Sequence, residues 1–538
     1  MTDWWQDRVV YQIYPRSFQD TDGDGIGDLQ GIISHLQELR ELGVGIIWLS
    51  PVYASPNDDN GYDISDYRSI NPEFGTMSDM DQLIAEAARL DIRVVMDLVI
   101  NHTSDEHEWF RRSRDPKSPY RSYYIWRPGE NGGPPNNWTS FFAEDCWEFD
   151  NKSGEYYLHL FSKKQPDLNY RNPAVLGEIE DIMRFWLDKG ISGFRCDVIN
   201  IIYKASLDDG VKKLALTGSE HYISRNGTHE ILRRLRKDVL EHYDCFTVGE
   251  TVFVTPQTAR DFCSKSRGEL DMLFSFEHME SDQFLVKWFK RRFRAARFAD
   301  AIAGWQNSLE WNANYFENHD QPRSVSRFGD DSVYWKESAK MLAVFLLSLR
   351  GTPYIYQGQE IGMTNFDFMS MAQIRDIESH NVYRLLRSKH VPKGLCWNII
   401  RASSRDNART PMQWNSSGNA GFTTGDPWLG VNQNYRRINV EDQKKDPASI
   451  RSFYLYMIAL RHKSETLRYG TFLAGRISNR LVSFDREYNG ERLTVLLSFS
   501  QKPQKAPCPG KMLLASSGRS EYDGILAPYE AVIIQRGV

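Results

Sequence analysis

The chain has 538 residues, and its 66 basic and 71 acidic side chains leave a net charge of only -5. This balance does not favour a nucleic-acid groove or a membrane surface, so we expect a small, neutral binding partner. The length predicts two or three domains, one of them large. We expect the protein to be a monomer or a weak homo-oligomer.

The N-terminus has no basic stretch followed by an apolar core, so no signal peptide is expected. The longest apolar run, residues 341–349, is shorter than the roughly 20 residues that span a bilayer. The six cysteines stand singly, without CxxC pairs, which is typical of reduced thiols. These features predict a cytoplasmic protein with no membrane or nucleic-acid partner.

Short β-rich runs alternate with amphipathic stretches along most of the chain. The predicted strands are 9–14, 46–49, 93–98, 193–196, 246–248, 272–274, 314–316 and 352–356. Helical periodicity covers 29–42, 77–90, 174–189, 229–242 and 338–349. This alternation predicts an α/β fold, a (β/α)8 TIM barrel.

Two parts of the chain do not fit the barrel pattern. The gap between the third and fourth strands is too long for one helix, and its aromatic, Gly- and Pro-rich composition predicts an inserted domain over residues 103–172. From residue 464 to residue 538 the pattern changes to short alternating strands, which predict an antiparallel β-sandwich. The barrel itself is expected over 1–102 and 173–463, and residues 366–426 are expected to be a long irregular region.

Three predicted barrel strands each end at or just before an acidic residue: Asp197, Glu250 and Asp320. In a TIM barrel the carboxyl ends of the strands meet on one face, so these acids are expected to converge. Retaining glycosidases need one carboxylate as nucleophile and one carboxylic acid to protonate the leaving oxygen. Arg195 lies two residues before Asp197 and projects to the same side, where its charge would keep Asp197 ionised.

The sequence motifs around these acids resemble those of the α-amylase-like glycoside hydrolase family, family 13, in its oligo-1,6-glucosidase and α-glucosidase branch. The matching motifs are Asp97-Leu-Val-Ile-Asn-His102, Gln165-Pro-Asp-Leu-Asn169, Gly193-Phe-Arg-Cys-Asp197, Val248-Gly-Glu250 and Asn318-His-Asp320. The resemblance implies that Asp197 is the nucleophile of a covalent glucosyl-enzyme and that Glu250 is the acid/base. It implies that Asp320 holds sugar hydroxyls and stabilises the transition state.

The resemblance also implies a set of substrate-binding residues. Those expected to grip the terminal glucose are Asp63, His102, Arg195, His319 and Arg409, with Tyr62, Phe142 and Gln165 at further pocket positions. The resemblance thus implies an α-glucoside as the small-molecule partner.

A loop near the N-terminus, Asp20-Thr-Asp-Gly-Asp-Gly-Ile-Gly-Asp28, begins like a Ca²⁺ loop. The twelfth position is Gly31, so the bidentate Glu of an EF-hand is absent. A matching loop in the family branch implies a structural Ca²⁺ or Mg²⁺ site with ligands Asp20, Asp22, Asp24, the Ile26 carbonyl and Asp28. No organic cofactor is expected.

The residue after the nucleophile is Val198, which in the resembling branch accompanies cleavage of α-1,6 bonds. We therefore expect an exo-acting, retaining α-glucosidase that removes non-reducing α-1,6-linked glucose from isomaltose, panose and short isomalto-oligosaccharides. The stretch 251–255 and the run Ala143-Glu-Asp-Cys146 depart from the common family pattern. Three alternatives therefore stay open: a sucrose isomerase or transglucosidase, an α-glucosidase that prefers α-1,4 bonds, sucrose or isomaltulose, and, remotely, a non-catalytic barrel relative.

Overall fold

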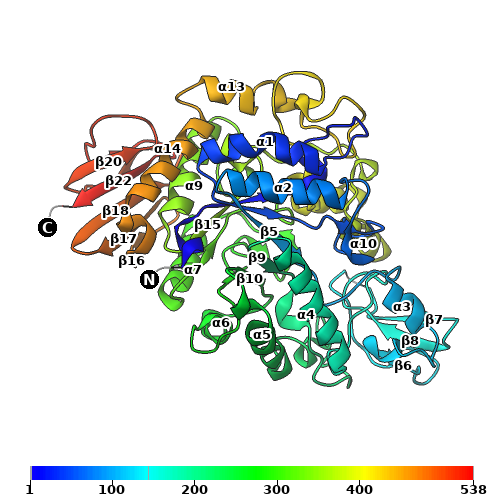
Figure 1. The fold of residues 1–538 in the computed structure, drawn as a ribbon. Helices are drawn as coiled ribbons and strands as arrows, with labels where there is room; N and C mark the ends of the chain where they lie inside the picture. Colours follow the sequence, from blue (N-terminus) through cyan, green and yellow to red (C-terminus); the bar gives the residue numbers. More distant parts are fainter. Residues whose placement is uncertain (1–2, 143, 537–538) are drawn as a thin grey trace.

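A closed barrel of eight parallel strands forms the centre of the computed structural model, which describes residues 3–142 and 144–536 (Figure 1). Around the barrel the strands are β1 (Val10–Ile13), β2 (Ile46–Leu49), β5 (Arg93–Leu98), β9 (Gly193–Cys196), β10 (Phe246–Glu250), β11 (Met272–Phe274), β14 (Ala313–Asn314) and β15 (Thr352–Tyr356), and β15 pairs back to β1. The predicted TIM barrel is confirmed. The seventh strand begins one residue earlier than predicted and covers only two residues.

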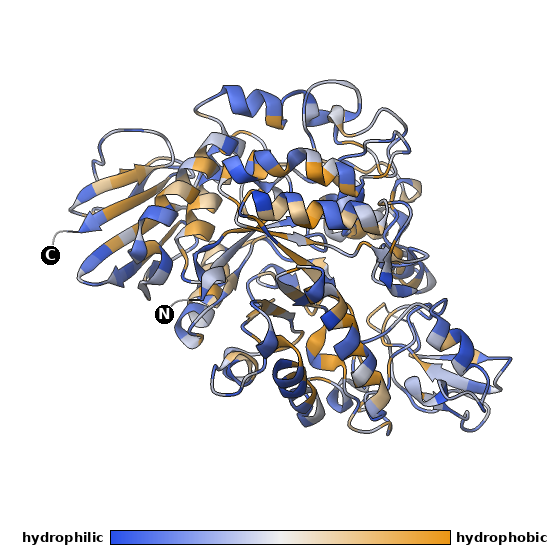
Figure 2. Cartoon of the chain, in the orientation of Figure 1, coloured by the Kyte–Doolittle hydropathy of each residue, from blue (hydrophilic) through white to orange (hydrophobic). Residues whose placement is uncertain are grey.

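The barrel strands are buried on both faces, which explains their continuous apolar runs. The surrounding helices are α1 (Leu29–Leu42), α2 (Met77–Arg89), α4 (Pro173–Asp188), α5 (Asn226–Asp238), α6 (Pro256–Cys263), α7 (Ala295–Ser308), α8 (Ser324–Phe328), α9 (Trp335–Ser348), α13 (Val440–Lys445), α14 (Ile450–Lys463) and α15 (Glu465–Tyr469). Side chains cap several of them: Asp28 accepts from Gly31 at α1, and Thr76 from Asp79 at α2. Apolar residues line the strands and the inner sides of helices such as α4 (Figure 2).

The segment between β5 and β9 contains α3 (Glu108–Ser113) and a three-stranded antiparallel sheet. Its strands lie in the order β6 (Trp126–Arg127), β8 (Glu155–Leu158) and β7 (Trp147–Asp150). In Figure 1 this inserted segment (cyan) and the C-terminal sheet (orange to red) lie on opposite sides of the barrel.

The C-terminal region is antiparallel, as predicted. Five strands lie in the order β16 (Thr471–Ile477), β17 (Leu481–Tyr488), β18 (Glu491–Ser498), β22 (Ala531–Arg536) and β20 (Lys511–Ala515). A separate two-stranded ladder joins β19 (Gln504–Lys505) to β21 (Ile525–Leu526). Smaller ladders elsewhere join β3 (Tyr53–Ala54) to β4 (Asp66–Ile70) and β12 (Gln283–Phe284) to β13 (Val286–Lys290).

The expectation of a long irregular region over 366–426 is wrong in part. This stretch contains α10 (Ile377–Ser388), α11 (Lys393–Ser403) and the short α12 (Asp406–Arg409). Three of the four residues that α10 buries are polar, Glu378, Ser379 and Asn381, so its buried face is not marked by an apolar run. Within the described residues, no helix is long and apolar enough to cross a membrane.

Candidate active site

Two of the three predicted catalytic acids are joined by one buried arginine. Arg195, on β9, pairs through Nη1 with Asp197 and, at 2.8 Å, with Oδ1 of Asp97 on β5. Its Nη2 lies 2.6 Å from Oε2 of Glu250, at the end of β10. The side chain of Arg195 is only 2% exposed, so these charge-assisted contacts are shielded from water. The predicted convergence of Asp197 and Glu250 is therefore present in the structure.

This cluster places three carboxyl groups around one guanidinium. Burial raises the pKa of Asp97 to about 6, although Arg195 opposes the shift. Burial also raises the pKa of Asp197 well above its ordinary value, with Arg195 lowering it and the neighbouring carboxylates of Glu250 and Asp97 adding to the rise. Like charges held this close titrate together, so the cluster retains a proton more readily than isolated carboxyls do. One ionised and one protonated carboxyl is the state that retaining catalysis needs.

The third acid, Asp320, stands in the opposite electrostatic environment. Its Oδ1 lies 2.7 Å from Nη2 of Arg409 and 3.4 Å from Nη1 of Arg405. Burial alone would raise the pKa of Asp320, but His319 and the two guanidinium groups lower it far below its ordinary value. Asp320 is therefore an ionised acceptor at neutral pH.

His319 connects this acid to the first cluster. Burial lowers the pKa of His319 to about 3, so the ring is neutral. Its Nδ1 lies 2.8 Å from Nε2 of Gln12, an amide donor, which leaves the ring proton on Nε2, 2.7 Å from the hydroxyl oxygen of Tyr62. The Tyr62 hydroxyl in turn donates to Oδ2 of Asp97 at 3.3 Å, and its ring stacks on His319 with centroids 5.3 Å apart. Nε2 of His319 also lies 3.3 Å from Oδ2 of Asp320, so His319 and Tyr62 link the two acidic clusters.

His102 and Gln165 lie together beside this chain. Nε2 of His102 is 3.1 Å from the carbonyl oxygen of Tyr62 and 3.2 Å from Nε2 of Gln165. Burial lowers the pKa of His102 to about 4, so it is neutral. Phe142 is 5% exposed and lies under the guanidinium of Arg405 at 5.5 Å. Its neighbour Ala143, at the start of the unusual run 143–146, lies outside the described residues.

The carboxylate of Asp63 is held by hydrogen bonds within its own loop. Its carboxylate accepts from Ser55 Oγ at 3.0 Å and from the amides of Asp58 and Asp59 at 2.8 and 3.1 Å, all within its own loop. Asp59 is the acid of this loop that reaches the arginines, since its Oδ1 lies 3.0 Å from Nη2 of Arg405. The structure therefore brings Asp59, rather than Asp63, next to Asp320. The sugar-binding role of Asp63 stays a prediction, and Asp59 lies in the same short loop.

Arg405, Asp59, Asp97 and Asp376 are site residues that the sequence reasoning missed. Arg405 bridges Asp59 at 3.0 Å, Asp376 at 2.7 Å and Asp320 at 3.4 Å. The sequence feature that could have identified Arg405 is its position one helical turn before Arg409, at the start of α12. The sequence feature that marks Asp97 is an acidic residue within a largely apolar strand, where the register sets it opposite Arg195.

Val198 lies directly beside the nucleophile in a strained conformation. Its φ of 37° is in the left-handed region, which a β-branched residue rarely adopts. Its amide donates to Oε2 of Glu250 at 3.3 Å, and its side chain packs in an apolar cluster with Tyr222. This strained conformation directs the Val198 amide toward the predicted acid/base. Strained backbone conformations are typically found at active sites.

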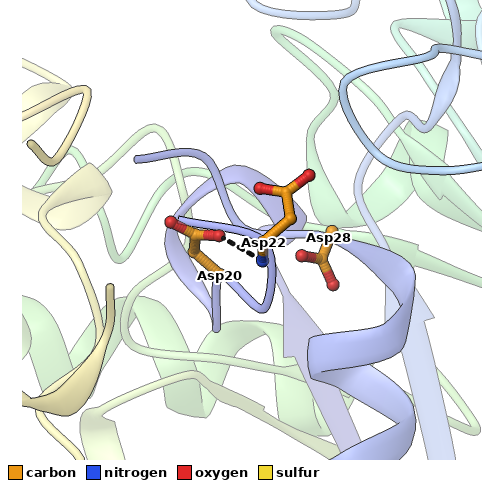
Figure 3. A group of neighbouring side chains, drawn as sticks. All are labelled: Asp20, Asp22 and Asp28. Carbon is orange, nitrogen blue, oxygen red and sulfur yellow. Dashed lines mark hydrogen bonds between the residues drawn. The ribbon is translucent and has the colours of Figure 1, made fainter. Parts of the chain in front are cut away.

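The acidic loop before α1 gathers three of its predicted ligands. Carboxylate oxygens of Asp20, Asp22 and Asp28 lie within 4.8 Å of one another (Figure 3), whereas Asp24 lies outside the group. Asp20 accepts from the amides of Asp22, Gly23 and Gly25 at 2.8–3.0 Å, which curls the loop around it. No described Lys or Arg pairs with these acids. An oxygen-rich, uncompensated cluster suits a hard cation such as Ca²⁺ or Mg²⁺.

The comparisons with known proteins agree with this geometry. The family model for the alpha amylase catalytic domain matches residues 12–470. The oligo-1,6-glucosidase of Parageobacillus thermoglucosidasius is 52% identical over 93% of this chain and 91% of its own length, and that of Halalkalibacterium halodurans is 48% identical over 98% of both. Among solved structures, the isomaltulose synthase from Klebsiella sp. LX3 aligns with a TM-score of 0.97 at 39% identity, covering 99% of both chains. The chain belongs to the α-amylase family of glycoside hydrolases.

Proposed function

We propose that this protein is an exo-acting, retaining α-glucosidase that removes terminal, non-reducing α-1,6-linked glucose from isomaltose, panose and short isomalto-oligosaccharides. The observation that carries the proposal is the single guanidinium of Arg195 shared by Asp197 and Glu250. The identity to oligo-1,6-glucosidases over nearly the whole chain supports the substrate class.

In this mechanism Asp197 attacks the anomeric carbon while Glu250 gives its proton to the departing glycosidic oxygen. The glucosyl-enzyme forms as the C–O bond breaks, and the leaving sugar departs with the proton. Glu250, now ionised, takes a proton from water, which attacks the anomeric carbon and releases glucose and free Asp197. Arg195 supports both halves because it contacts both carboxyls.

The sugar's hydroxyls require fixed, ionised and neutral partners around the reacting carbon. Asp320, held ionised by Arg405 and Arg409, is suited to accept from two hydroxyls of the glucose. The neutral imidazoles of His102 and His319 and the hydroxyl of Tyr62 supply further contacts. Asp59, paired with Arg405, is positioned to close the pocket around the non-reducing end of the sugar, and a closed pocket limits the enzyme to exo cleavage.

The α-1,6 preference rests on Val198, whose apolar side chain shapes the space beside the nucleophile. A product-resolved panel of maltose, isomaltose, panose, sucrose and isomaltulose tests the proposal. We expect a higher kcat/KM on isomaltose and panose than on maltose, with free glucose as product. A higher value on maltose would refute the linkage assignment, and slow action on soluble starch is expected of an exo enzyme.

A second candidate, a sucrose isomerase or transglucosidase, is favoured by the close likeness to an isomaltulose synthase structure. Such an enzyme shares the glucosyl intermediate but passes glucose to a sugar in place of water. Isomaltulose or trehalulose formed from sucrose would favour this candidate, whereas free glucose and fructose would favour hydrolysis.

We also propose that the loop of Asp20, Asp22 and Asp28 holds a structural Ca²⁺ or Mg²⁺, with Asp24 and the Ile26 carbonyl completing the ligand set. When bound, the ion would neutralise the loop ahead of α1 and take no part in the chemistry. We further propose a cytoplasmic location, which the six free thiols support. A monomer or weak homo-oligomer remains our proposal for the assembly.

A further inference from the structure

A cavity of about 650 Å³ lies between the inserted segment and the barrel, away from the acids described above. It is lined by residues of three stretches, 121–127, 168–171 and 203–208 together with Glu155, and by none of Asp197, Glu250 or Asp320. Its volume falls within the roughly 300–1,000 Å³ typical of pockets for small molecules. The mechanism proposed above makes no use of it.

One wall of the cavity is apolar. Ile125 and Leu168 are buried there. Trp126, also in the lining, is 7% exposed. These apolar side chains suit the carbon skeleton of a small molecule.

The polar lining contains more free cations than free acids. Arg121 is paired with Glu155 at 2.5 Å, and Lys204 with Asp167 at 2.5 Å. Arg127 and Arg171 have no acidic partner among the described residues. Arg171 donates through Nη2 to the carbonyls of Lys204, at 3.2 Å, and of Ala205, and it stacks over Tyr203 at 5.5 Å, so only its Nε and Nη1 have no acceptor among the described residues. The only carboxylate of the lining without a described basic partner is that of Asp208.

This combination indicates the chemistry of the ligand. Guanidinium groups recognise phosphate with their forked donors, and two of those in the lining have no acidic partner among the described residues. Asp208 and the side chains of Ser122 and Asn169 can exchange hydrogen bonds with hydroxyls, while the apolar wall accommodates a carbon skeleton. We propose that this cavity is a binding site for a phosphorylated sugar, with the phosphate held by Arg127 and Arg171.

Lys204 links the cavity to the catalytic pocket. It lines the cavity, and its Nζ lies 2.8 Å from Oδ1 of Asn101 as well as 2.5 Å from Oδ2 of Asp167. Asp167 forms a β-bridge with His102, and Asn101 Nδ2 lies 3.2 Å from the His102 ring. Occupation of the cavity therefore bears on His102 through two buried contacts, and a ligand there changes the affinity for the substrate. This coupling rests on the proposed function, whereas the binding site does not.

Calorimetric titration of the full-length protein with glucose 6-phosphate tests the site, with saturating glucose present throughout to fill the catalytic pocket. We expect binding that weakens at least tenfold in Arg127→Gln and in Arg171→Gln. Arg111→Gln, an exposed change in α3 outside the cavity, should bind like the unaltered protein. Absence of binding, or equal binding by the Arg127→Gln variant, would overturn the site. If inorganic phosphate binds as tightly as glucose 6-phosphate, the proposal that the site recognises the sugar would be refuted.

The kinetic arm measures KM for isomaltose with and without glucose 6-phosphate. We expect a KM shift of threefold or more that is lost in Arg127→Gln, since competition inside the catalytic pocket would persist in that variant. An unchanged KM in a protein that binds the ligand would overturn the coupling. Failure to hydrolyse any α-glucoside would instead reject the proposed function and leave the titration result standing.

Discussion

Nη2 of Arg195 forms an ion pair with Oε2 of Glu250 at 2.6 Å, across the neighbouring strands β9 and β10. The strand register sets Arg195 opposite Val248, two residues before the acid, so both side chains point to the same side of the barrel wall. The arginine that supports the nucleophile also orients the predicted acid/base, so both chemical steps depend on its forked shape.

Arg195→Lys should test this dependence. The ammonium keeps the charge but cannot present two rigid donors to Asp97, Asp197 and Glu250 at once. We expect kcat/KM on isomaltose to fall about 100-fold or more, because a misplaced reacting group costs about that much. The melting temperature should be measured alongside, with Arg111→Lys as the control. Activity within threefold of the original would mean that the fork is dispensable.

Asp59 and Asp63 should respond differently to the same change. Asp59→Asn removes the charge that pairs with Arg405 beside Asp320, so we expect kcat/KM to fall by about two powers of ten or more in a folded protein. Asp63→Asn disturbs a carboxylate that holds loop amides, so its main effect should be a lower melting temperature. Burial raises the pKa of Asp63 to about 7, which makes the neutral amide a mild substitute. The reverse pattern would support the prediction that Asp63 is a sugar-binding acid.

Removal of a bound cation should loosen the acidic loop without stopping the chemistry. Asp20, Asp22 and Asp28 would repel one another in the absence of a cation, so a chelator should lower the melting temperature and leave kcat nearly unchanged once the protein is kept folded. The paired change Asp22→Asn and Asp28→Asn should abolish the response to the chelator, and elemental analysis should show the loss of the ion. A native protein without stoichiometric Ca²⁺ or Mg²⁺ would rule the site out.

The sequence predicted the barrel well because its strands are buried on both faces and therefore read as apolar runs between amphipathic helices. Ile46–Leu49 and Arg93–Leu98 match their predicted bounds. Helix α10 was not predicted because most of the residues that it buries are polar. One of them, Glu378, joins the charged network around Arg405. Local pattern alone carries no sign of that kind of burial.

The same limit applies to the candidate site. Asp197 and Glu250 could be predicted because they lie at strand ends. The partners of Arg405, however, come from loops far apart in the chain, at Asp59, Asp320 and Asp376. A motif shows that an acid is present in a loop, whereas only the folded loop shows whether Asp59 or Asp63 faces the arginine. The catalytic and sugar-binding roles themselves stay predictions until the variants are measured.

Glu360 provides a pH-dependent test of the barrel. It is buried, accepts from the Tyr11 hydroxyl at 2.9 Å, and its second oxygen has no partner among the described residues. Burial raises its pKa from 4.5 to about 7, so the folded protein binds this proton more tightly than the unfolded chain. The resulting stabilisation is complete below pH 4.5 and is lost as the pH rises through 7.

Glu360→Gln keeps the acceptor for Tyr11 but carries no charge. Between pH 5 and pH 9 the free energy of unfolding of the original protein should fall more steeply than that of the variant, by at most about 3 kcal/mol. Urea unfolding at several pH values measures the difference, and Glu441→Gln, on the exposed side of α13, serves as the control. Parallel pH profiles for the Glu360→Gln variant and the original protein would show that Glu360 does not titrate in this range. The free energy of unfolding depends on pH only where the folded and unfolded states bind different numbers of protons.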